Sequence, residues 1–279
     1  LWLTCTDCWP ESPVRFPRNI LTTPKNCPKI VSSEFEYQPS PQMLKGRVIV
    51  ITGASGGLGS ALSIACAKLG ATVVLSGRSV KKLEAVYDQI EAEGGVQPAI
   101  LPMNLMTATW GEYEAFAASL EQNLGRLDGL VHAAAHFKSF ARMEDLEPRE
   151  WLDSLQVNLT AAYTLTRQCL PLLRRSPDAS VIQIQDGDRD NVRPFRGIYG
   201  IAKNAAAELN LALAAELTPD QNLRFNVVDP GPMRTALRMQ GFSGESPVSA
   251  PLPESRLARL LWLLGPDSAG ISGNTYARP

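Results

Sequence analysis

A glycine-rich turn, Thr52-Gly-Ala-Ser-Gly-Gly-Leu-Gly59, joins a β-branched run to an apolar helical pattern and restricts the folds open to this chain. The run before it, Val48-Ile-Val-Ile51, is typical of a strand buried on both faces. Glycine lets the backbone turn tightly and approach a phosphate, and the following helix start adds amide donors and a positive dipole end. The turn predicts a dinucleotide site, with a plain tight turn as the alternative. The residues expected to form the cradle are Thr52, Gly53, Ser55, Gly57, Leu58 and Gly59.

Strand and helix patterns alternate along the rest of the chain. The expected strands cover 48–51, 72–75, 99–101, 129–132, 180–184, 224–228 and 274–277. The expected helices cover 58–69, 113–124, 197–217 and 256–264, a long helix pair covers 148–174, and one more helix begins after Ser79. This alternation predicts an α/β fold, a single Rossmann-fold domain with a doubly wound parallel sheet and helices on both faces.

The proposed domain covers residues 43–279. Residues 1–42 carry seven prolines and no clear hydrophobic period, so we expect them to form a poorly ordered N-terminal extension. Residues 240–255 are rich in Gly, Ser and Pro and are expected to form a mobile loop.

Composition argues against several classes of function. The formal net charge of −1 gives no general attraction for nucleic acid or an anionic membrane, and no apolar run approaches the length of a bilayer span. The five cysteines are odd in number and scattered, which argues against a disulfide framework and favours the cytoplasm. Cys5 and Cys8 have the spacing of half a zinc site, but tetrahedral zinc needs four ligands and no partner pair follows. We therefore expect a small-molecule substrate and no metal.

The residues after the second expected strand indicate which dinucleotide is bound. An NAD site normally places a carboxylate there, to bind the ribose hydroxyls. This chain has Gly77 and Arg78 instead, with Lys81 and Lys82 one turn later. A guanidinium pairs well with a 2′-phosphate, so the sequence favours NADP(H) over NAD(H). The alternative is that these cations form a solvated helix start.

Tyr199 and Lys203 are spaced one helical turn apart, which places a phenol and an ammonium on the same face. A free phenol has a pKa near 10, and a nearby cation favours the phenolate and lowers that value. Such a pair can transfer a proton near neutral pH. Thirteen residues before Tyr199 stands Asp186, and no Ser or Thr occurs between Ser180 and Tyr199.

Four motifs now make the chain resemble the short-chain dehydrogenase/reductase family over residues 44–277. They are Thr52-Gly53-x-x-x-Gly57-x-Gly59, Leu155-Gln-Val-Asn158, Tyr199-x-x-x-Lys203, and Pro230-Gly231 with Thr235. The stretches Tyr37-Gln-Pro39, Leu260-Leu-Trp-Leu-Leu264 and Asp267-Ser268 resemble a bacterial branch of uncharacterised oxidoreductases.

The resemblance implies roles for particular residues. Tyr199 is the expected proton donor, Lys203 its activator and a ribose ligand, and Asn158 the anchor of a relay water. Asp186 stands where the family has a catalytic serine, so it is expected to contact the substrate. Further cofactor contacts are expected from Asn104, Leu105, Ala133, Pro230, Gly231 and Thr235. The long helices around the fifth strand imply a homodimer or homotetramer.

Three departures from the family pattern leave the activity open. The family's Asn-Ala-Gly is Ala133-Ala-Ala135, its adenine-side carboxylate is Asn104, and its serine is Asp186. One reading is an NAD(P)(H)-dependent oxidoreductase acting on a carbonyl/alcohol pair. A second has a protonated Asp186 that polarises the substrate, and it resembles the pteridine reductases, which reduce a C=N bond. The third is an NADP(H)-binding protein with a degenerate active site.

Overall fold

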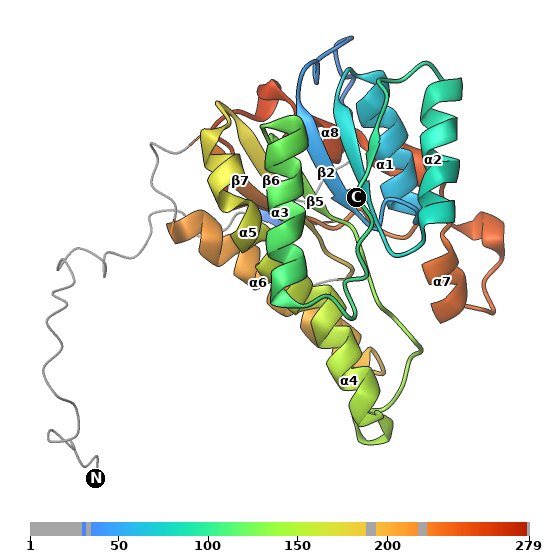
Figure 1. The fold of residues 1–279 in the computed structure, drawn as a ribbon. Helices are drawn as coiled ribbons and strands as arrows, with labels where there is room; N and C mark the ends of the chain where they lie inside the picture. The colour runs from blue at the N-terminus through green and yellow to red at the C-terminus, as the bar shows by residue number, and fades with distance from the viewer. Residues whose placement is uncertain (1–29, 32–34, 188–193, 217–221, 278–279) are drawn as a thin grey trace, which may run out of the picture.

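One parallel sheet runs through the protein (Figure 1). The computed structural model describes residues 30–31, 35–187, 194–216 and 222–277. Within this part of the chain the strands lie in the order β1-β8-β7-β6-β5-β2-β3-β4, and every neighbouring pair is parallel. The strands are β1 (Ile30–Val31), β2 (Val48–Thr52), β3 (Thr72–Ser76), β4 (Ala99–Ile100), β5 (Gly129–His132), β6 (Ala179–Ile184), β7 (Leu223–Val228) and β8 (Thr275–Tyr276).

Strands β2 to β8 have the order 3-2-1-4-5-6-7 when they are numbered along the chain, as in a Rossmann-like sheet. The order reverses between β2 and β5, where Thr52 pairs with His132. Ligands of open α/β sheets bind outside the carboxyl ends of the strands at such a reversal. The predicted fold class is confirmed, and the glycine turn lies at the reversal.

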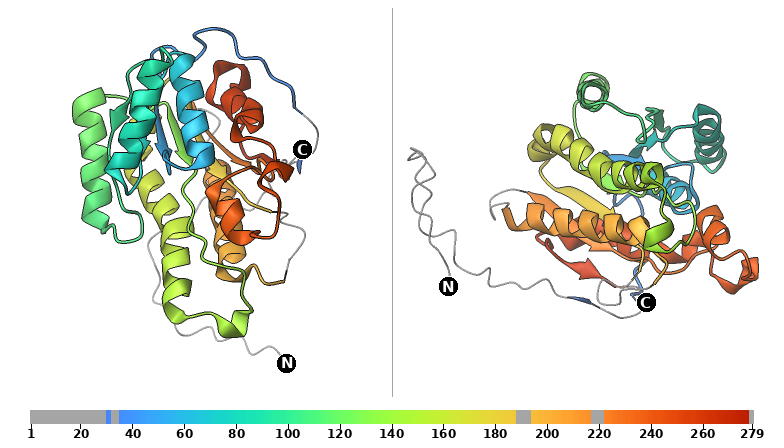
Figure 2. Two further views of the ribbon diagram at one scale, coloured as in Figure 1. Left: turned by 90° about the vertical axis from the view of Figure 1, so that its right-hand side faces the viewer. Right: turned by 90° about the horizontal axis from the view of Figure 1, so that it is seen from below.

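Helices cover both faces of this sheet (Figure 2). Those on one face are α1 (Gly57–Lys68), α2 (Val80–Ala92) and α8 (Ala258–Leu264), and those on the other are α3 (Trp110–Leu124), α5 (Ala161–Arg175) and α6 (Gly197–Glu216). The side chains of β2 alternate between the two cores: Ile49 and Ile51 join the first, whereas Val48 and Val50 join the second. Because successive side chains of a strand point to opposite faces, the β-branched run is buried along its whole length.

The helix pair expected over 148–174 is joined by a wider turn. α4 (Pro148–Leu155) continues into a π-helical turn, η3 (Gln156–Thr160), and then into α5. α4 begins at a proline, which needs no N–H in the first turn of a helix. In Figure 1 this helix extends below the sheet. π-helical turns recur at functional sites, and this one carries Asn158.

Residues on the N-terminal side of the expected domain boundary also contact the domain. The Arg259 guanidinium lies 3.4 Å from the ring centroid of Phe35, and the Tyr37 hydroxyl donates to Oδ2 of Asp267 at 2.7 Å. Strand β1 pairs with β8 at the sheet edge. Residues 1–29 and 32–34 lie outside the described residues, so the poorly ordered extension stays a prediction there.

Short helical turns lie beside and within the segment 240–255, which was expected to be a mobile loop. α7 (Ala236–Gly241) is followed by the 3-10 turns η4 (Pro247–Ser249) and η5 (Pro253–Arg256). Thr235 caps α7, because its hydroxyl accepts from the backbone N–H of Arg238 at 3.2 Å. Gly, Ser and Pro mark helix starts as well as loops, so composition alone did not indicate these short helical turns, and the mobility of the segment stays a prediction. Two further 3-10 turns are η2 (Met143–Asp145) and η6 (Pro266–Ser268).

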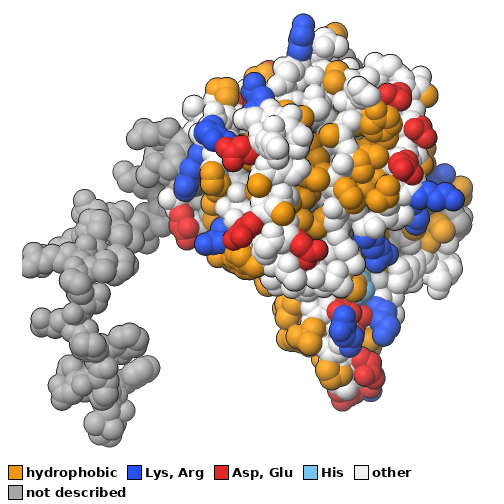
Figure 3. All heavy atoms as spheres, in the orientation of Figure 1, with side chains coloured by type: hydrophobic (Ala, Val, Ile, Leu, Met, Phe, Trp, Pro, Cys, Tyr) orange, Lys and Arg blue, Asp and Glu red, His pale blue; other side chains and the backbone are white. Residues whose placement is uncertain are grey.

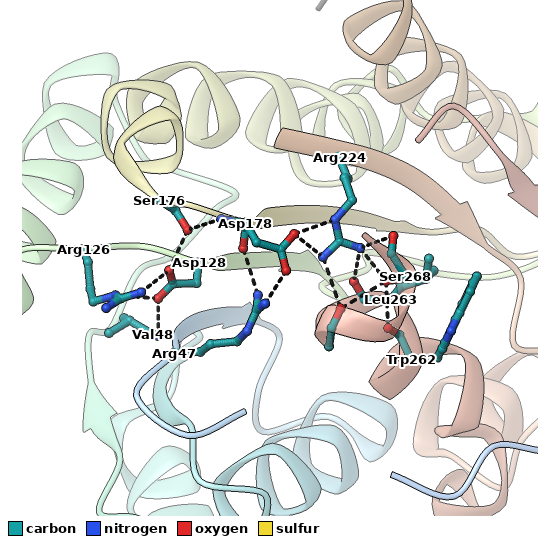
Figure 4. A network of polar contacts seen from close by, with 11 residues as sticks. Arg47, Val48, Arg126, Asp128, Ser176, Asp178, Arg224, Trp262, Leu263 and Ser268 are labelled. Atoms are coloured by element: carbon teal, nitrogen blue, oxygen red, sulfur yellow. Dashed lines mark hydrogen bonds and ion pairs between the residues drawn. The ribbon is translucent and has the colours of Figure 1, made fainter. Parts of the chain in front are cut away.

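An ion-pair network lies at the amino ends of the parallel strands (Figure 4). Asp178 precedes β6 and pairs with both Arg47 and Arg224, and the Arg224 side chain is only 3 % exposed. Nη1 of Arg224 also donates to the carbonyl oxygens of Leu263 at 3.0 Å and Ser268 at 3.1 Å. A buried charge is costly unless it is paired and hydrogen-bonded, so this network holds β6, β7 and the end of α8 in fixed positions.

Charges of both signs are interspersed over the face of the molecule shown in Figure 3. This pattern matches the small net charge of the chain. Among the described residues, no helix combines the length and apolar character needed to cross a membrane.

Candidate active site

A cavity of about 680 Å³ opens at the carboxyl edge of the sheet. Its volume is in the range of small-molecule and cofactor sites. All of the predicted site residues except Asn158 line it: Thr52, Gly53, Ser55, Gly57, Leu58, Gly59, Arg78, Asn104, Leu105, Ala133, Asp186, Tyr199, Lys203, Pro230, Gly231 and Thr235. The fold therefore brings together residues that are up to 183 positions apart in the sequence (52 to 235).

The glycine turn forms a cradle that side chains would fill. Gly53 has φ +67°, and a Cβ there would lie 2.8 Å from the Cα of Ala134. A Cβ on Gly59 would lie 2.2 Å from the carbonyl oxygen of Gly53. Helix α1 begins at Gly57, so its free amides face the same space. This geometry fits a pyrophosphate held at a helix N-terminus.

The first departure from the family pattern is explained by the contacts of Thr52. Its hydroxyl accepts from the backbone N–H of Ala134 at 3.2 Å and donates to the carbonyl of Val131 at 3.3 Å. The turn is thus tied to the chain after β5 through backbone groups of the alanine run. Alanine at these positions keeps the sheet and the cradle joined.

The segment before α7 closes against the same turn. A Cβ on Gly57 would meet Cγ2 of Thr235 at 2.7 Å. Gly231 has φ +77°, and its backbone N–H donates to Oδ1 of Asp229 at 2.8 Å. The predicted nicotinamide-side turn is therefore next to the predicted phosphate-side turn, as one continuous cofactor site requires.

Two cations lie where the sequence places the adenosine ribose. β3 ends at Ser76, and Arg78 and Lys82 both line the cavity beyond it, whereas Lys81 does not. No carboxylate occurs between Ser76 and Lys82. This set of side chains fits a 2′-phosphate better than a bare ribose diol.

Helix α6 presents Tyr199 and Lys203 one turn apart at the inner end of the cavity, where they are 5 % and 2 % exposed. The Tyr199 hydroxyl donates to Oδ2 of Asp186 at 2.7 Å. Arg196 lies on the other side of this carboxylate, with its Nη2 at 3.2 Å from Oδ1, and its Nη1 donates to the backbone carbonyl of Asp186. The three predicted groups are thus in one cluster, together with an arginine that sequence reasoning missed.

The electrostatics of this cluster favour an ionised Asp186. Burial alone would raise the pKa of Asp186, but the charge of Arg196, the hydrogen bond from Tyr199 and the charge of Lys203 together lower it. This direction disfavours the alternative in which Asp186 stays protonated. Burial, followed by the charge of Asp186, raises the pKa of Tyr199 well above its usual value. Burial lowers the pKa of Lys203 to about 8, against the opposing charges of Asp186 and Asp229.

Asn158 lies beside the cavity, in the π-helical turn. Its Oδ1 accepts from the backbone N–H of His136 at 3.0 Å, and its Nδ2 donates to the carbonyls of His136 at 2.8 Å and Ser154 at 3.0 Å. The side chain therefore ties η3 to the segment after β5. A small space of about 10 Å³ next to it is lined also by His132 and Gln183, which is close to the size that holds one water. Its role as a relay anchor stays a prediction.

Sequence reasoning also missed the aromatic wall of the cavity. Phe137 meets the ring of Tyr199 edge-on at a centroid distance of 5.2 Å, and Phe140 lies 5.0 Å from Phe137 and 5.1 Å from Phe242. These rings come from the segment after β5 and from the end of α7. The only local signal was the occurrence of three aromatic residues in two segments without a clear period.

The sequence profile of the short chain dehydrogenase family matches residues 47–246. Together with the sheet order and the cavity, this match shows that the chain belongs to that family.

Particular relatives can be compared in detail. The chain is 35% identical over 240 residues to the uncharacterised oxidoreductase YciK of Escherichia coli strain K12, covering 86% of this chain and 94% of YciK. A solved short chain dehydrogenase from Pseudomonas syringae is 40% identical, with a TM-score of 0.85, over 88% of this chain and 99% of that one. Another, from E. coli CFT073 in complex with NADPH, is 35% identical, with a TM-score of 0.82, over 86% and 99%. The resemblance to a branch of uncharacterised oxidoreductases is confirmed, and these relatives give the pterin reading no support.

Proposed function

We propose that this oxidoreductase transfers hydride between NADPH and a carbonyl/alcohol pair. The observation that carries the proposal is the buried Tyr199–Lys203 pair at the inner end of a cavity that begins at the glycine turn. A proton donor and a dinucleotide cradle in one cavity suit the reduction of a polar double bond.

The preference for NADP(H) over NAD(H) is part of the proposal. Arg78 and Lys82 line the cavity after β3 and supply positive charge for a 2′-phosphate. The relative from E. coli CFT073 was solved with NADPH, which supports the same preference here.

The residues of the chain act on the proton and on the substrate's position. When bound, NADPH supplies the hydride. Tyr199 holds the proton that the substrate oxygen takes up, and the charge of Arg196 opposes the effect of Asp186 on the phenol. Asp186 cannot replace a serine as a donor to the carbonyl, because an ionised carboxylate only accepts hydrogen bonds.

A second candidate function is NADP(H) binding without turnover. The observation that favours it is the hydrogen bond from Tyr199 to Asp186, which keeps the proton on the phenol. Fluorescence titration with NADPH, followed by turnover assays on ketones and aldehydes, separates the two. Turnover that is lost in Tyr199→Phe supports the enzyme, whereas tight NADPH binding with no turnover of any carbonyl supports the second function. Failure to bind NADPH would contradict both.

We further propose a homodimer or homotetramer in the cytoplasm. Trp151 on α4, Tyr163 on α5 and Ile201 on α6 are exposed apolar side chains, which suits an interface built from these helices. Cys66 and Cys169 are free thiols, as expected in a reducing compartment. Light scattering of the purified chain gives the mass of the assembly, and a monomer would contradict this proposal.

A further inference from the structure

The carboxylate of Asp186 faces the cavity beside the proton of Tyr199 and can only accept hydrogen bonds. Its side chain is 45% exposed, so a ligand in the cavity can reach it. A carbonyl oxygen placed next to both groups would be attracted by the phenol and repelled by the carboxylate, because it carries only lone pairs. A plain ketone is therefore a poor match for this pair.

We propose that Asp186 selects carbonyl substrates that carry a hydroxyl group on the carbon next to the carbonyl. The inference rests on the proposed function and names the substrate class of the same site. In this arrangement the phenol proton of Tyr199 turns from Asp186 to the carbonyl oxygen, and the substrate hydroxyl donates to the Asp186 oxygen in its place. Oxygens on adjacent carbons that point the same way lie roughly one O–H···O hydrogen-bond length apart. This spacing matches the 2.7 Å between Oη of Tyr199 and Oδ2 of Asp186.

Arg196 explains why the donor is a neutral hydroxyl rather than an ammonium or a protonated imine. Its guanidinium pairs with the Asp186 carboxylate and lines the cavity, and Lys203 adds a second cation nearby. A cationic ligand would be repelled by both. The absence of a side chain at Gly187 leaves space for this arginine. Gly187 has φ +104°, and a Cβ there would lie 2.2 Å from Nη1 of Arg196.

The aromatic wall identifies the rest of the substrate as apolar. Phe137, Phe140 and Phe242 form a chain of edge-on contacts that ends at the ring of Tyr199, and all three line the cavity. Aromatic rings favour such edge and offset contacts with one another. An aryl hydroxyketone meets both the wall and the Tyr199–Asp186 pair.

The reaction is balanced with the cofactor of the proposed function. The carbonyl carbon gains a hydride and the carbonyl oxygen gains the proton of Tyr199, so that the C=O bond becomes a C–OH group. The product is a vicinal diol, and NADPH is oxidised to NADP⁺ by two electrons. The neighbouring hydroxyl keeps its proton, and Tyr199 is reprotonated from solvent.

Three probes of similar shape test the inference: 2-hydroxyacetophenone, its methyl ether 2-methoxyacetophenone, and acetophenone. The ether keeps the oxygen but removes the donor. We expect kcat/KM with NADPH to be about 10- to 100-fold higher for the hydroxyketone than for either control, the effect of one hydrogen bond to a charged group. In the complex with NADP⁺, where no reduction occurs, calorimetry should show that the hydroxyketone binds with a lower Kd than either control.

The variant Asp186→Ala completes the test, with NADPH binding as the check that it has folded. The preference should fall toward unity in Asp186→Ala, which removes the acceptor. Equal turnover and equal Kd values for the hydroxyketone and its ether in the wild-type chain would overturn the inference while leaving the carbonyl reductase in place. NADPH binding without turnover of any of the three would overturn the proposed function and, with it, this inference.

Discussion

The hydroxyl of Tyr199 donates to the carboxylate of Asp186 at 2.7 Å, so the proton that a reductase delivers is held by a neighbouring anion. Arg196 balances that anion from the opposite side. The cluster therefore differs from a simple tyrosine–lysine pair in both its charge and its hydrogen-bond polarity. The pH dependence of the reaction should report this difference.

Replacing Asp186 by Ser should shift the rising, acid-side limb of the pH profile of alcohol oxidation to lower pH. Burial and then the charge of Asp186 raise the pKa of Tyr199, so removing the anion lowers it. Oxidation needs the phenolate, and each unit by which the pKa falls should raise kcat/KM below the limb about tenfold. Profiles of kcat/KM against pH measure the shift. Asp267→Ser is the matched control, because Asp267 accepts from Tyr37 at the same 2.7 Å but does not line the cavity. An unmoved limb in the Asp186 variant would contradict the prediction.

Arg78→Ala should weaken NADPH binding by about 10- to 100-fold and leave NADH binding nearly unchanged. Its guanidinium lines the cavity after β3 and would pair with the 2′-phosphate that NADH lacks. Fluorescence titration with each nucleotide provides the Kd values. Lys81→Ala serves as the control, since Lys81 does not line the cavity. Equal losses for the two nucleotides would rule out the NADP preference.

Gly53→Ala should abolish NADPH binding at concentrations that saturate the wild-type chain. The new Cβ would lie 2.8 Å from the Cα of Ala134, and the backbone at φ +67° is strained for alanine. Gly94→Ala is the control: its φ of +72° is similar, but nothing lies within 4 Å of a Cβ there. The control should cost about 1 kcal/mol of stability and keep NADPH binding. If both variants bind NADPH equally well, the cradle is not the cofactor site.

The stability of the fold should fall in mild acid because of His132. Burial, followed by the charge of Lys203, lowers its pKa to about 3 from the usual 6.5. Between these values the unfolded chain binds a proton that the folded chain does not, so stability is full above pH 6.5 and declines as the pH falls toward 3. The slope from this group is at most about 1.4 kcal/mol per pH unit. Urea unfolding of the wild type and of His132→Gln at several pH values should show this contribution disappear in the variant; an identical slope would refute it.

Asp178→Ala should lower the free energy of unfolding by about 3–5 kcal/mol. It would leave the buried guanidinium of Arg224 without its carboxylate partner. Glu121→Ala is the matched control, because the Glu121–Arg175 pair is more than half exposed on both sides. That change should cost no more than about 1 kcal/mol. Similar losses in the two variants would mean that the network of Figure 4 contributes little.

The parts of the site that could be predicted are those that depend on short spacings. The glycine turn and the Tyr199–Lys203 pair follow from local backbone geometry, and a strand-helix alternation is enough to place them at one sheet edge. The alternation also predicted a doubly wound parallel sheet, since parallel strands joined by helices allow few topologies.

The parts that could not be predicted depend on contacts between distant segments. Arg196 pairs with Asp186 only because Gly187 adopts a positive φ and leaves room for the guanidinium. Phe242 follows α7 and packs against Phe140, although it lies in the segment where the composition indicated a loop. The hydrophobic pattern of the sequence around Asn158 does not distinguish the π-helical turn from an α-helix.

Strand β6 separates two kinds of chemistry. Asp178 precedes the strand and belongs to the ion-pair network, whereas Asp186 follows it and belongs to the cavity. Eight residues of extended chain place these carboxylates roughly 26 Å apart. Effects at that separation are expected to be additive. Substrate preference can therefore be redesigned at one end of β6 without changing the contribution that the ion-pair network at the other end makes to the free energy of unfolding.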